Sequence, residues 1–268
     1  EEVMQGVTEV YHCAGLVSFN SKQKKQLSQI NVEGTTNIVN ACLSANIRKL
    51  VHVSSVAVFG KNITHSLINE KAPWDNEKNT SFYGKTKYYG EMEVWRGIGE
   101  GLNAAIVNPS IIIGRYGDWT KGSMAIFKNI YNNFPWYSDG VTGFVDADDV
   151  AKAMMMIMQS DITAERFILS AENKSYYDIF CMIADGFGKK HPYKKVTPLM
   201  ASVIWRLEKL KSWLTKNDPL ITKETATTAL AKIQYDNNKL LSMLPDFGYT
   251  PLKKSIENIC HFIQKQKN

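Results

Sequence analysis

The chain has 268 residues, of which 44% are hydrophobic and 22% are charged, and its formal net charge is +6. This composition excludes a disordered chain, and no apolar run approaches the roughly 20 residues that a membrane-spanning helix needs. The positive charge comes from scattered lysines and no nucleic-acid-binding motif accompanies it, so we expect a solvated surface and no nucleic-acid partner.

The four cysteines are far apart and include no Cys-x-x-Cys pair, and none of the five histidines has the spacing of metal ligands. We therefore expect no metal site. Free thiols of this kind are typical of a reducing compartment, which predicts a cytoplasmic protein.

The N-terminal half alternates strands with helices. Apolar runs predict strands at residues 8–13, 50–54 and 104–107, and helical periodicity predicts helices at 27–45, ended by Asn46, and from 83 through 95, ended by the glycines at 97–101. Such alternation indicates a parallel sheet with right-handed crossovers. Ligands of such sheets bind beyond the carboxyl ends of the strands.

The C-terminal half is organised differently. A strand at 144–146 precedes a methionine-rich helix that Asp146 or Asp149 can cap, and a second short strand follows at 167–169. Ser175 with Asp178 predicts a helix start and Gly188 its end, while Thr250-Pro251 opens the terminal helix. A basic amphipathic stretch at 199–214 favours packing on a lobe over lying on a membrane.

The chemistry is indicated by Tyr83 and Lys87. Four residues apart on a helix, they project from one face, where the ammonium can lower the pKa of the phenol and ready it for proton transfer. Tyr235 and Lys239 have the same spacing, but the polar residues at 236–238 predict a loop there rather than a βα unit. Tyr83 is therefore the candidate acid/base, the alternative being a packed helix tyrosine.

Ser54 and Ser55 end the second predicted strand, at the edge where ligands bind. Ser55 is a candidate catalytic residue. The alternative is an ordinary polar residue at the end of a strand, whose side chain hydrogen-bonds the next loop. The triplet Gly97-x-Gly99-x-Gly101 is not a phosphate loop, because it follows a helix and precedes a strand.

Five segments, in order, resemble the motifs of extended short-chain dehydrogenases/reductases, the NAD-dependent epimerase/dehydratase family. They are residues 10–15, 31–37, 53–60, the Tyr83-x-x-x-Lys87 pair and 108–110. Residues 134–137 and 143–151 are most similar to the dihydroflavonol-reductase-like branch of that family. The resemblance implies a Rossmann-like, doubly wound parallel sheet with a smaller C-terminal substrate lobe.

The resemblance also implies a role for each matching residue. Tyr83 would exchange a proton with the substrate oxygen, Lys87 would lower its pKa and bind the nicotinamide ribose, and Ser55 would orient the reacting carbonyl or hydroxyl. The implied cofactor-binding residues are Cys13, Ala14, Gly15, Asn31, Ser54, Tyr83, Lys87, Pro109 and Ser110. The cofactor would be NAD or NADP, and the segment that normally selects between them precedes Glu1.

The family's first strands and Gly-rich turn have no counterpart here, so we expect a fragment of a longer protein, about 60 to 70 residues having been lost at about 30 per βα unit. The expected domains are a partial Rossmann domain at 1–116 and a substrate lobe at 117–268, with a segment at about 141–160 returning to the sheet. Trp119, Met124, Phe134, Trp136 and Tyr137 would offer substrate-binding surface.

The leading hypothesis is an NAD(P)-dependent oxidoreductase that interconverts a ketone and a secondary alcohol on a small molecule. Alternatives are a nucleotide-sugar epimerase or dehydratase, which Asp148 disfavours because many relatives have arginine there, and a non-catalytic binding protein. The resemblance further suggests a homodimer through the helices at 27–45 and 83–95.

Overall fold

The computed structural model describes residues 2–59, 67–74, 80–116, 118–203, 205–206 and 223–267. Gly60 of the third motif and the greater part of the basic stretch 199–214 lie outside these residues. The chain divides into two compact units. The first comprises Glu1–Ser110, Val150–Leu169 and Asp236–Gly248, and the second comprises Ile111–Asp149, Ser170–Tyr235 and Tyr249–Asn268.

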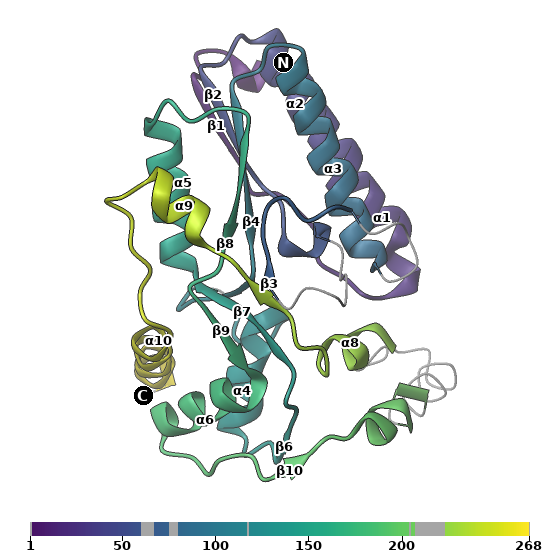
Figure 1. Ribbon diagram of the computed structural model, residues 1–268, viewed down its shortest axis with the longest axis vertical. Coiled ribbons are helices and arrows are strands. Elements are labelled where there is room, and N and C mark those ends of the chain that lie inside the picture. The colour runs from purple at the N-terminus through teal and green to yellow at the C-terminus, as the bar shows by residue number, and fades with distance from the viewer. Residues whose placement is uncertain are drawn as a thin grey trace. The chain divides into compact units, whose positions relative to one another are not determined.

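A four-stranded parallel sheet organises the first unit, as the alternating pattern predicted. Its strands, in spatial order, are β1 (Glu9–His12), β2 (Lys49–Val53), β4 (Ala104–Pro109) and β8 (Glu165–Leu169). Every residue of β4 is buried, as is typical of parallel strands covered on both faces. Figure 1 shows α2 and α3 on one side of the sheet and α5 on the other.

The helix predicted at 27–45 is a continuous helical stretch with a π-helical turn inside it. It comprises α1 (Lys24–Ser28), η3 (Gln29–Glu33) and α2 (Gly34–Ser44), and Asn46, with a φ of 50°, ends it as predicted. The π-turn holds one residue more per turn than an α-helix, which apolar periodicity does not reveal.

The helix that carries Tyr83 is longer than predicted. α3 runs over Phe82–Gly99, and the chain turns out of it at Gly101, whose φ is 101°. The glycines at 97–101 therefore end the helix as predicted, although its last residue is Gly99 and not Trp95. Val94 of α3 packs with Val39 and Cys42 of α2 above Leu50 and Ile106 of the sheet, and this apolar cluster holds both helices on one face.

Two further helices belong wholly or largely to the first unit. α5 (Ala147–Gln159) begins where the Asp146 carboxylate accepts from the Asp148 N–H, so the predicted cap is confirmed at Asp146. Its Met154 and Met158 are buried core residues, whereas Met155 is exposed. The buried Lys49 ammonium donates to the carbonyls of Ile157 and Ser160 and so caps the end of α5. The second helix is α9 (Asn238–Met243).

Short elements complete the first unit: η1 (Glu2–Met4), η2 (Ser21–Gln23), η4 (Val56–Val58) and β3 (Leu67–Ile68). The segments that return to this unit are Val150–Leu169 and Asp236–Gly248. The sequence had placed the returning segment at about 141–160.

The second unit is built on a three-stranded sheet. β7 (Val141–Asp146) pairs parallel with β5 (Ile111–Ile113) and antiparallel with β9 (Glu172–Ser175). The helices α4 (Ala125–Tyr131), α6 (Tyr176–Phe187) and α10 (Leu252–Lys267) pack around one apolar core, against which Trp119 and Met124 also lie. The remaining elements are η5 (Gly122–Met124), β6 (Trp136–Tyr137), β10 (Lys194–Lys195), α8 (Lys223–Thr228) and β11 (Gln234–Tyr235).

The predicted ends of α6 are confirmed. The Ser175 hydroxyl accepts from the Asp178 N–H at 3.0 Å, and Gly188 ends the helix in the left-handed conformation. α10 begins one residue after Pro251. Among the helices that the structure describes, none is long and apolar enough to cross a membrane.

Candidate active site

Ser55 follows the carboxyl end of β2. The Ser54 N–H continues the sheet by donating to the Val107 carbonyl at 2.7 Å. Ser55 is extended, and its Oγ accepts from the Ala57 N–H at 3.2 Å, so it caps η4. The strand therefore leads to Ser55, whose backbone is held in place on both sides.

Tyr83 lies in the first turn of α3, where its phenol interacts with the Ser55 side chain. Burial raises the pKa of Tyr83 above its ordinary value, and the Ser55 side chain opposes this rise. The Ser81 side chain caps the helix by accepting from the Gly84 N–H at 2.7 Å. This cap fixes where the helix begins and so where Tyr83 projects.

Gly84 allows α3 to approach Ser55. A Cβ atom at this position would lie 2.7 Å from the Ala57 carbonyl oxygen and 2.9 Å from the Thr80 side chain. A larger residue would push the helix start away from η4. Gly84 thus sets the separation of Tyr83 and Ser55, a role that the sequence analysis missed.

Lys87 lies one helical turn after Tyr83 and is 4% exposed. Its Nζ donates to the Val53 carbonyl at 2.8 Å. Burial lowers the pKa of Lys87 to about 8, while Glu91 and Cys13 raise it. The lysine therefore stands beside the strand end that carries Ser55, and its expected effect on the pKa of Tyr83 stays a prediction.

Asn31 ties the loop after β1 to α3. Its Oδ1 accepts from the Leu16 N–H at 2.8 Å, and its Nδ2 donates to the Leu16 carbonyl at 2.9 Å and to the Thr86 hydroxyl at 3.0 Å. That hydroxyl donates in turn to the Tyr83 carbonyl at 2.8 Å. The loop and the turn carrying Tyr83 are thus held by one buried side chain.

The loop held by Asn31 leaves Cys13, Ala14 and Gly15 exposed. A Cβ atom at Gly15 would lie 3.6 Å from the Lys87 Nζ, so the bare backbone of this loop lies close to the ammonium. A dinucleotide could approach such a backbone without steric obstruction.

Pro109 is the last residue of β4, and the buried Ser110 follows it. The hydroxyls of Ser54 and Ser110 are buried and have no hydrogen-bond partner among the residues that the structure describes. Unsatisfied polar atoms at the carboxyl edge of a parallel sheet suit a polar ligand. Together with the exposed loop and the Lys87 ammonium, they fit a nicotinamide dinucleotide.

Comparison with known proteins agrees with this geometry. A model of the NAD dependent epimerase/dehydratase family matches residues 1–169. The chain belongs to this family.

Three similar proteins illustrate the relationship. A putative dihydroflavonol 4-reductase of Synechocystis is 27% identical over 97% of this chain and 77% of its own length. The crystal structure of gox2253 superposes with a TM-score of 0.80 at 25% identity, covering 99% of this chain and 81% of that one. A Bacillus cereus UDP-glucuronic acid 4-epimerase, solved with UDP-glucuronic acid and NAD, is 17% identical with a TM-score of 0.76, covering 99% and 78%.

The chain spans 52% to 63% of the length of four further curated relatives. The family is NAD-dependent by definition, in agreement with the cofactor class that the sequence predicted.

Two histidines of the parallel sheet are close enough to Lys87 to feel its charge. His12 and His52 are neighbours on β1 and β2, with ring centroids 5.0 Å apart, as expected for sheet residues. Burial, followed by the charge of Lys87, lowers the pKa of His12 to about 4 and that of His52 well below its ordinary value. Both rings are therefore neutral at physiological pH.

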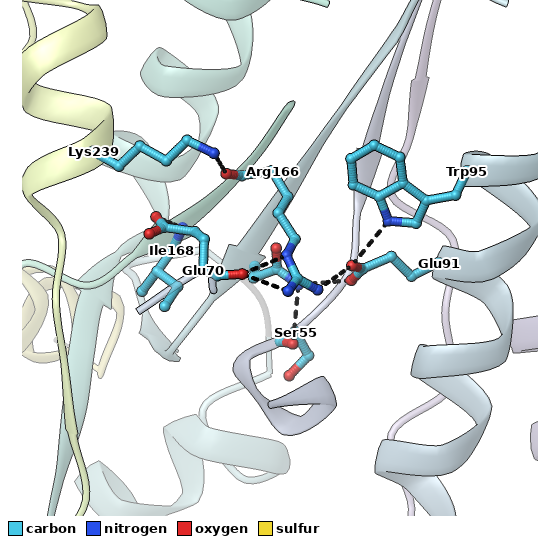
Figure 2. Close-up of polar contacts among 8 residues, drawn as sticks. Ser55, Glu70, Glu91, Trp95, Arg166, Ile168 and Lys239 are labelled. Carbon is cyan, nitrogen blue, oxygen red and sulfur yellow. Dashed lines mark hydrogen bonds and ion pairs between the residues drawn. The ribbon is translucent and has the colours of Figure 1, made fainter. Parts of the chain in front are cut away.

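The family member also contains a buried ion pair that the sequence analysis missed. Glu91 of α3 is completely buried, and its carboxylate accepts from Arg166 Nη1 at 3.1 Å and from Asn108 Nδ2 at 2.8 Å (Figure 2). The one available signal was the spacing of Glu91, which repeats the four-residue interval from Tyr83 to Lys87.

The second Tyr-x-x-x-Lys pair has structural roles. Tyr235 is buried in β11, where its backbone N–H donates to the Asn173 side chain, and burial raises its pKa strongly. The Lys239 ammonium is held by the Glu165 carboxylate at 2.6 Å and by the Arg166 carbonyl at 2.8 Å. These contacts leave Tyr83 and Lys87 as the candidate pair.

Proposed function

We propose that this chain is the catalytic part of an NAD(P)-dependent oxidoreductase that interconverts a ketone and a secondary alcohol. The observation that carries the proposal is the buried Lys87 ammonium held at the strand end that carries Ser55, with the Tyr83 phenol next to the Ser55 side chain. Two hydroxyls converging at the carboxyl edge of a parallel sheet can both reach one substrate oxygen.

The residues have distinct roles in this proposal. A bound nicotinamide supplies the hydride for reduction or accepts it in oxidation. Tyr83 donates its phenolic proton to the carbonyl oxygen as negative charge develops there, and Ser55 donates a hydrogen bond to the same oxygen. The Lys87 ammonium stabilises the phenolate that remains on Tyr83.

The cofactor would be held by the residues around this edge. The exposed backbone of residues 13–15 would lie against it, and Asn31 would keep that loop in place. Lys87 would bind the ribose hydroxyls, and Ser54, Pro109 and Ser110 would lie near the nicotinamide. Whether the chain takes NAD or NADP is left open in this proposal.

A reductase is favoured over a nucleotide-sugar epimerase by one observation. Asp148, where the resemblance to the family would imply arginine, forms an ion pair with Arg115 at 2.7 Å, so a carboxylate already occupies that guanidinium. This supports a substrate without a phosphate at that position. An epimerase would use the same Tyr83 and Lys87 but return the hydride to its substrate.

The test measures NAD(P)H oxidation by the full-length protein with a panel of aryl and alicyclic ketones. Net consumption of the reduced cofactor supports a reductase, and redox-neutral conversion of a UDP-sugar supports an epimerase.

Tyr83→Phe should lower kcat by roughly a hundredfold or more. Tyr89→Phe, an exposed tyrosine of the same helix, is the matched control. A Tyr83→Phe protein with unchanged turnover, or a protein that binds no dinucleotide, would point to a non-catalytic member.

A homodimer through α2 and α3, which the resemblance to the family suggested, stays a prediction. Light scattering of the purified protein measures its mass directly. An exposed Tyr89 next to the half-buried Tyr88 gives α3 an aromatic outer surface, and a Tyr89→Glu protein should be monomeric if that surface pairs.

A further inference from the structure

Two side chains hold the strand end that carries Ser55. The Lys87 Nζ donates to the Val53 carbonyl at 2.8 Å, and the Asn108 Nδ2 donates to the Ser55 carbonyl at 3.3 Å. The two carbonyls are two residues apart, one on either side of Ser54. The backbone of Ser55 is therefore fixed by groups from α3 and from β4.

Asn108 is held in turn by Glu91. The Asn108 amide is fully buried, and its Nδ2 donates one hydrogen bond to the Ser55 carbonyl and one to Glu91 Oε2 at 2.8 Å. Both protons of that amide are thereby used. Glu91 lies one helical turn after Lys87, so the same helix supports both points of attachment.

The Glu91 carboxylate is completely buried and is neutralised within the first unit. Its Oε1 accepts from Arg166 Nη1 at 3.1 Å and from the Trp95 indole at 3.4 Å (Figure 2). A buried carboxylate is retained as an ion only where a cation and several donors satisfy it. Glu91 has both, in the Arg166 guanidinium and the donors of Trp95 and Asn108.

Arg166 is itself rigidly placed. Its guanidinium donates to the Glu70 carbonyl, from Nε at 3.0 Å, and lies 4.8 Å from the centre of the Phe59 ring. The Glu70 carboxylate accepts from the Ile168 N–H at 2.9 Å, which anchors that segment to β8. Figure 2 shows this chain of contacts leading from β8 through Arg166 to Glu91.

We propose that Glu91 is a positioning residue of the candidate active site, which fixes the Ser55 backbone through Asn108 and places a negative charge one helical turn from Lys87. This inference rests on the proposed function. Arg166 serves to hold the Glu91 carboxylate in place.

The electrostatics around Lys87 support the second part of this role. Burial lowers the pKa of Lys87 to about 8, and Glu91 is the first of two groups that oppose the change, the other being Cys13 of the β1 loop. Lys87 also acts electrostatically on His12 and His52, and both imidazoles are neutral near pH 7. Among the residues that the structure describes, Glu91 is thus the carboxylate that acts on this lysine.

Three variants separate the two parts of the role. Glu91→Gln removes the charge and disturbs the bridge, whereas Asn108→Leu removes the bridge and keeps the charge. Glu91→Asp keeps the charge on a shorter side chain. Glu93→Gln, on an outer part of the same helix where Glu93 pairs with Arg96, is the matched control.

The first measurement is of kcat and KM in the full-length protein. The second is the titration of Lys87, followed by NMR in protein labelled with carbon-13 at lysine Cε. The Lys87 signal is assigned by its loss in Lys87→Met. Glu91→Gln should lower kcat about tenfold and the Lys87 midpoint by about one pH unit. Asn108→Leu should lower kcat by a similar factor with the midpoint unchanged. Glu91→Asp should restore the midpoint, and Glu93→Gln should change neither.

If a folded Glu91→Gln protein keeps both its kcat and the Lys87 titration midpoint, the proposal is wrong. It is also wrong if kcat falls only in proportion to a lower Tm. If Glu91→Gln does not fold, a normal kcat in Asn108→Leu or a lowered Lys87 midpoint in Glu91→Asp overturns the proposal. The NMR midpoint requires no turnover. If the wild-type protein reduces no ketone, the proposed function fails while a midpoint shift still supports the electrostatic role of Glu91.

Discussion

The side chains of Tyr83 and Ser55 interact, although they are 28 residues apart in the sequence and lie on different elements. Ser55 ends a buried strand, and Tyr83 begins the helix that packs beside it. The contact depends on two local features, the Ser81 cap that starts α3 and the glycine that follows Tyr83. This geometry leads to four predictions.

Ser55→Ala removes one of the two hydroxyls that would bind the substrate oxygen. We expect kcat/KM for ketone reduction to fall by about 10- to 100-fold, because the oxyanion loses a donor. Steady-state kinetics measures this change. Ser123→Ala, in the second unit, provides the control, and equal effects of the two substitutions would remove Ser55 from the site.

The pKa of about 8 for Lys87 predicts an alkaline limit to activity. Lys87 is an ammonium below this pH and a neutral amine above it, so kcat/KM should decline as pH rises through about 8. Lys87→Met should reduce kcat by roughly a hundredfold and abolish that decline. A decline of the same midpoint in Lys87→Met would assign it to another group.

Gly84→Ala should separate Tyr83 from Ser55. The added Cβ would lie 2.7 Å from the Ala57 carbonyl oxygen, so α3 or η4 must move. We expect a loss of 1–3 kcal/mol of stability, about the usual cost of overpacking, together with a larger fall in kcat than in substrate affinity. Gly99→Ala is the control, since a Cβ there would meet no atom within 4 Å. Urea unfolding and kinetics report the two effects.

The lowered pKa of His12 predicts that the first unit loses stability in acid. Its pKa is about 4 in the folded protein and about 6.5 when unfolded, so the unfolded state binds more protons between these values. The stability contributed by neutral His12 is complete above pH 6.5 and is lost as pH falls towards 4.

His12→Gln keeps a hydrogen-bonding side chain that does not titrate. The fall in unfolding free energy from pH 7.5 to pH 5 should then be about 2 kcal/mol smaller than in the wild-type protein. Urea titrations at both pH values measure it. An identical fall in the variant would show that other groups cause the acid instability.

Much of the first unit could be predicted from the sequence. The apolar runs ending at Ser54 and at Asn108 are continuous because their strands are buried on both faces, and this located the edge of the sheet. Tyr83 and Lys87 stood out from the equally spaced Tyr235 and Lys239 only because a βα pattern surrounds them. The resemblance to the family added the candidate roles of the loop at residues 13–15.

Other features depend on tertiary structure and could not be predicted. Glu91 and Arg166 are 75 residues apart, and they meet only because β8 pairs with β4 in one particular register. Likewise, the end of α3 lies beyond Gly97 because that residue is buried in the helix packing, which outweighs its weak intrinsic helix preference. The intrinsic preferences of the residues predict neither the register of β8 against β4 nor the packing around Gly97.

The π-helical turn η3 has a consequence for how the site tolerates change. It bears Asn31, whose carbonyl faces Gly90 of α3 so closely that no side chain fits between them. Any residue larger than glycine at position 90 would displace Asn31, and with it the loop at Leu16 and the hydroxyl of Thr86. A position without reactive chemistry of its own therefore governs whether the loop at Leu16 and the helical turn that carries Tyr83 keep their alignment.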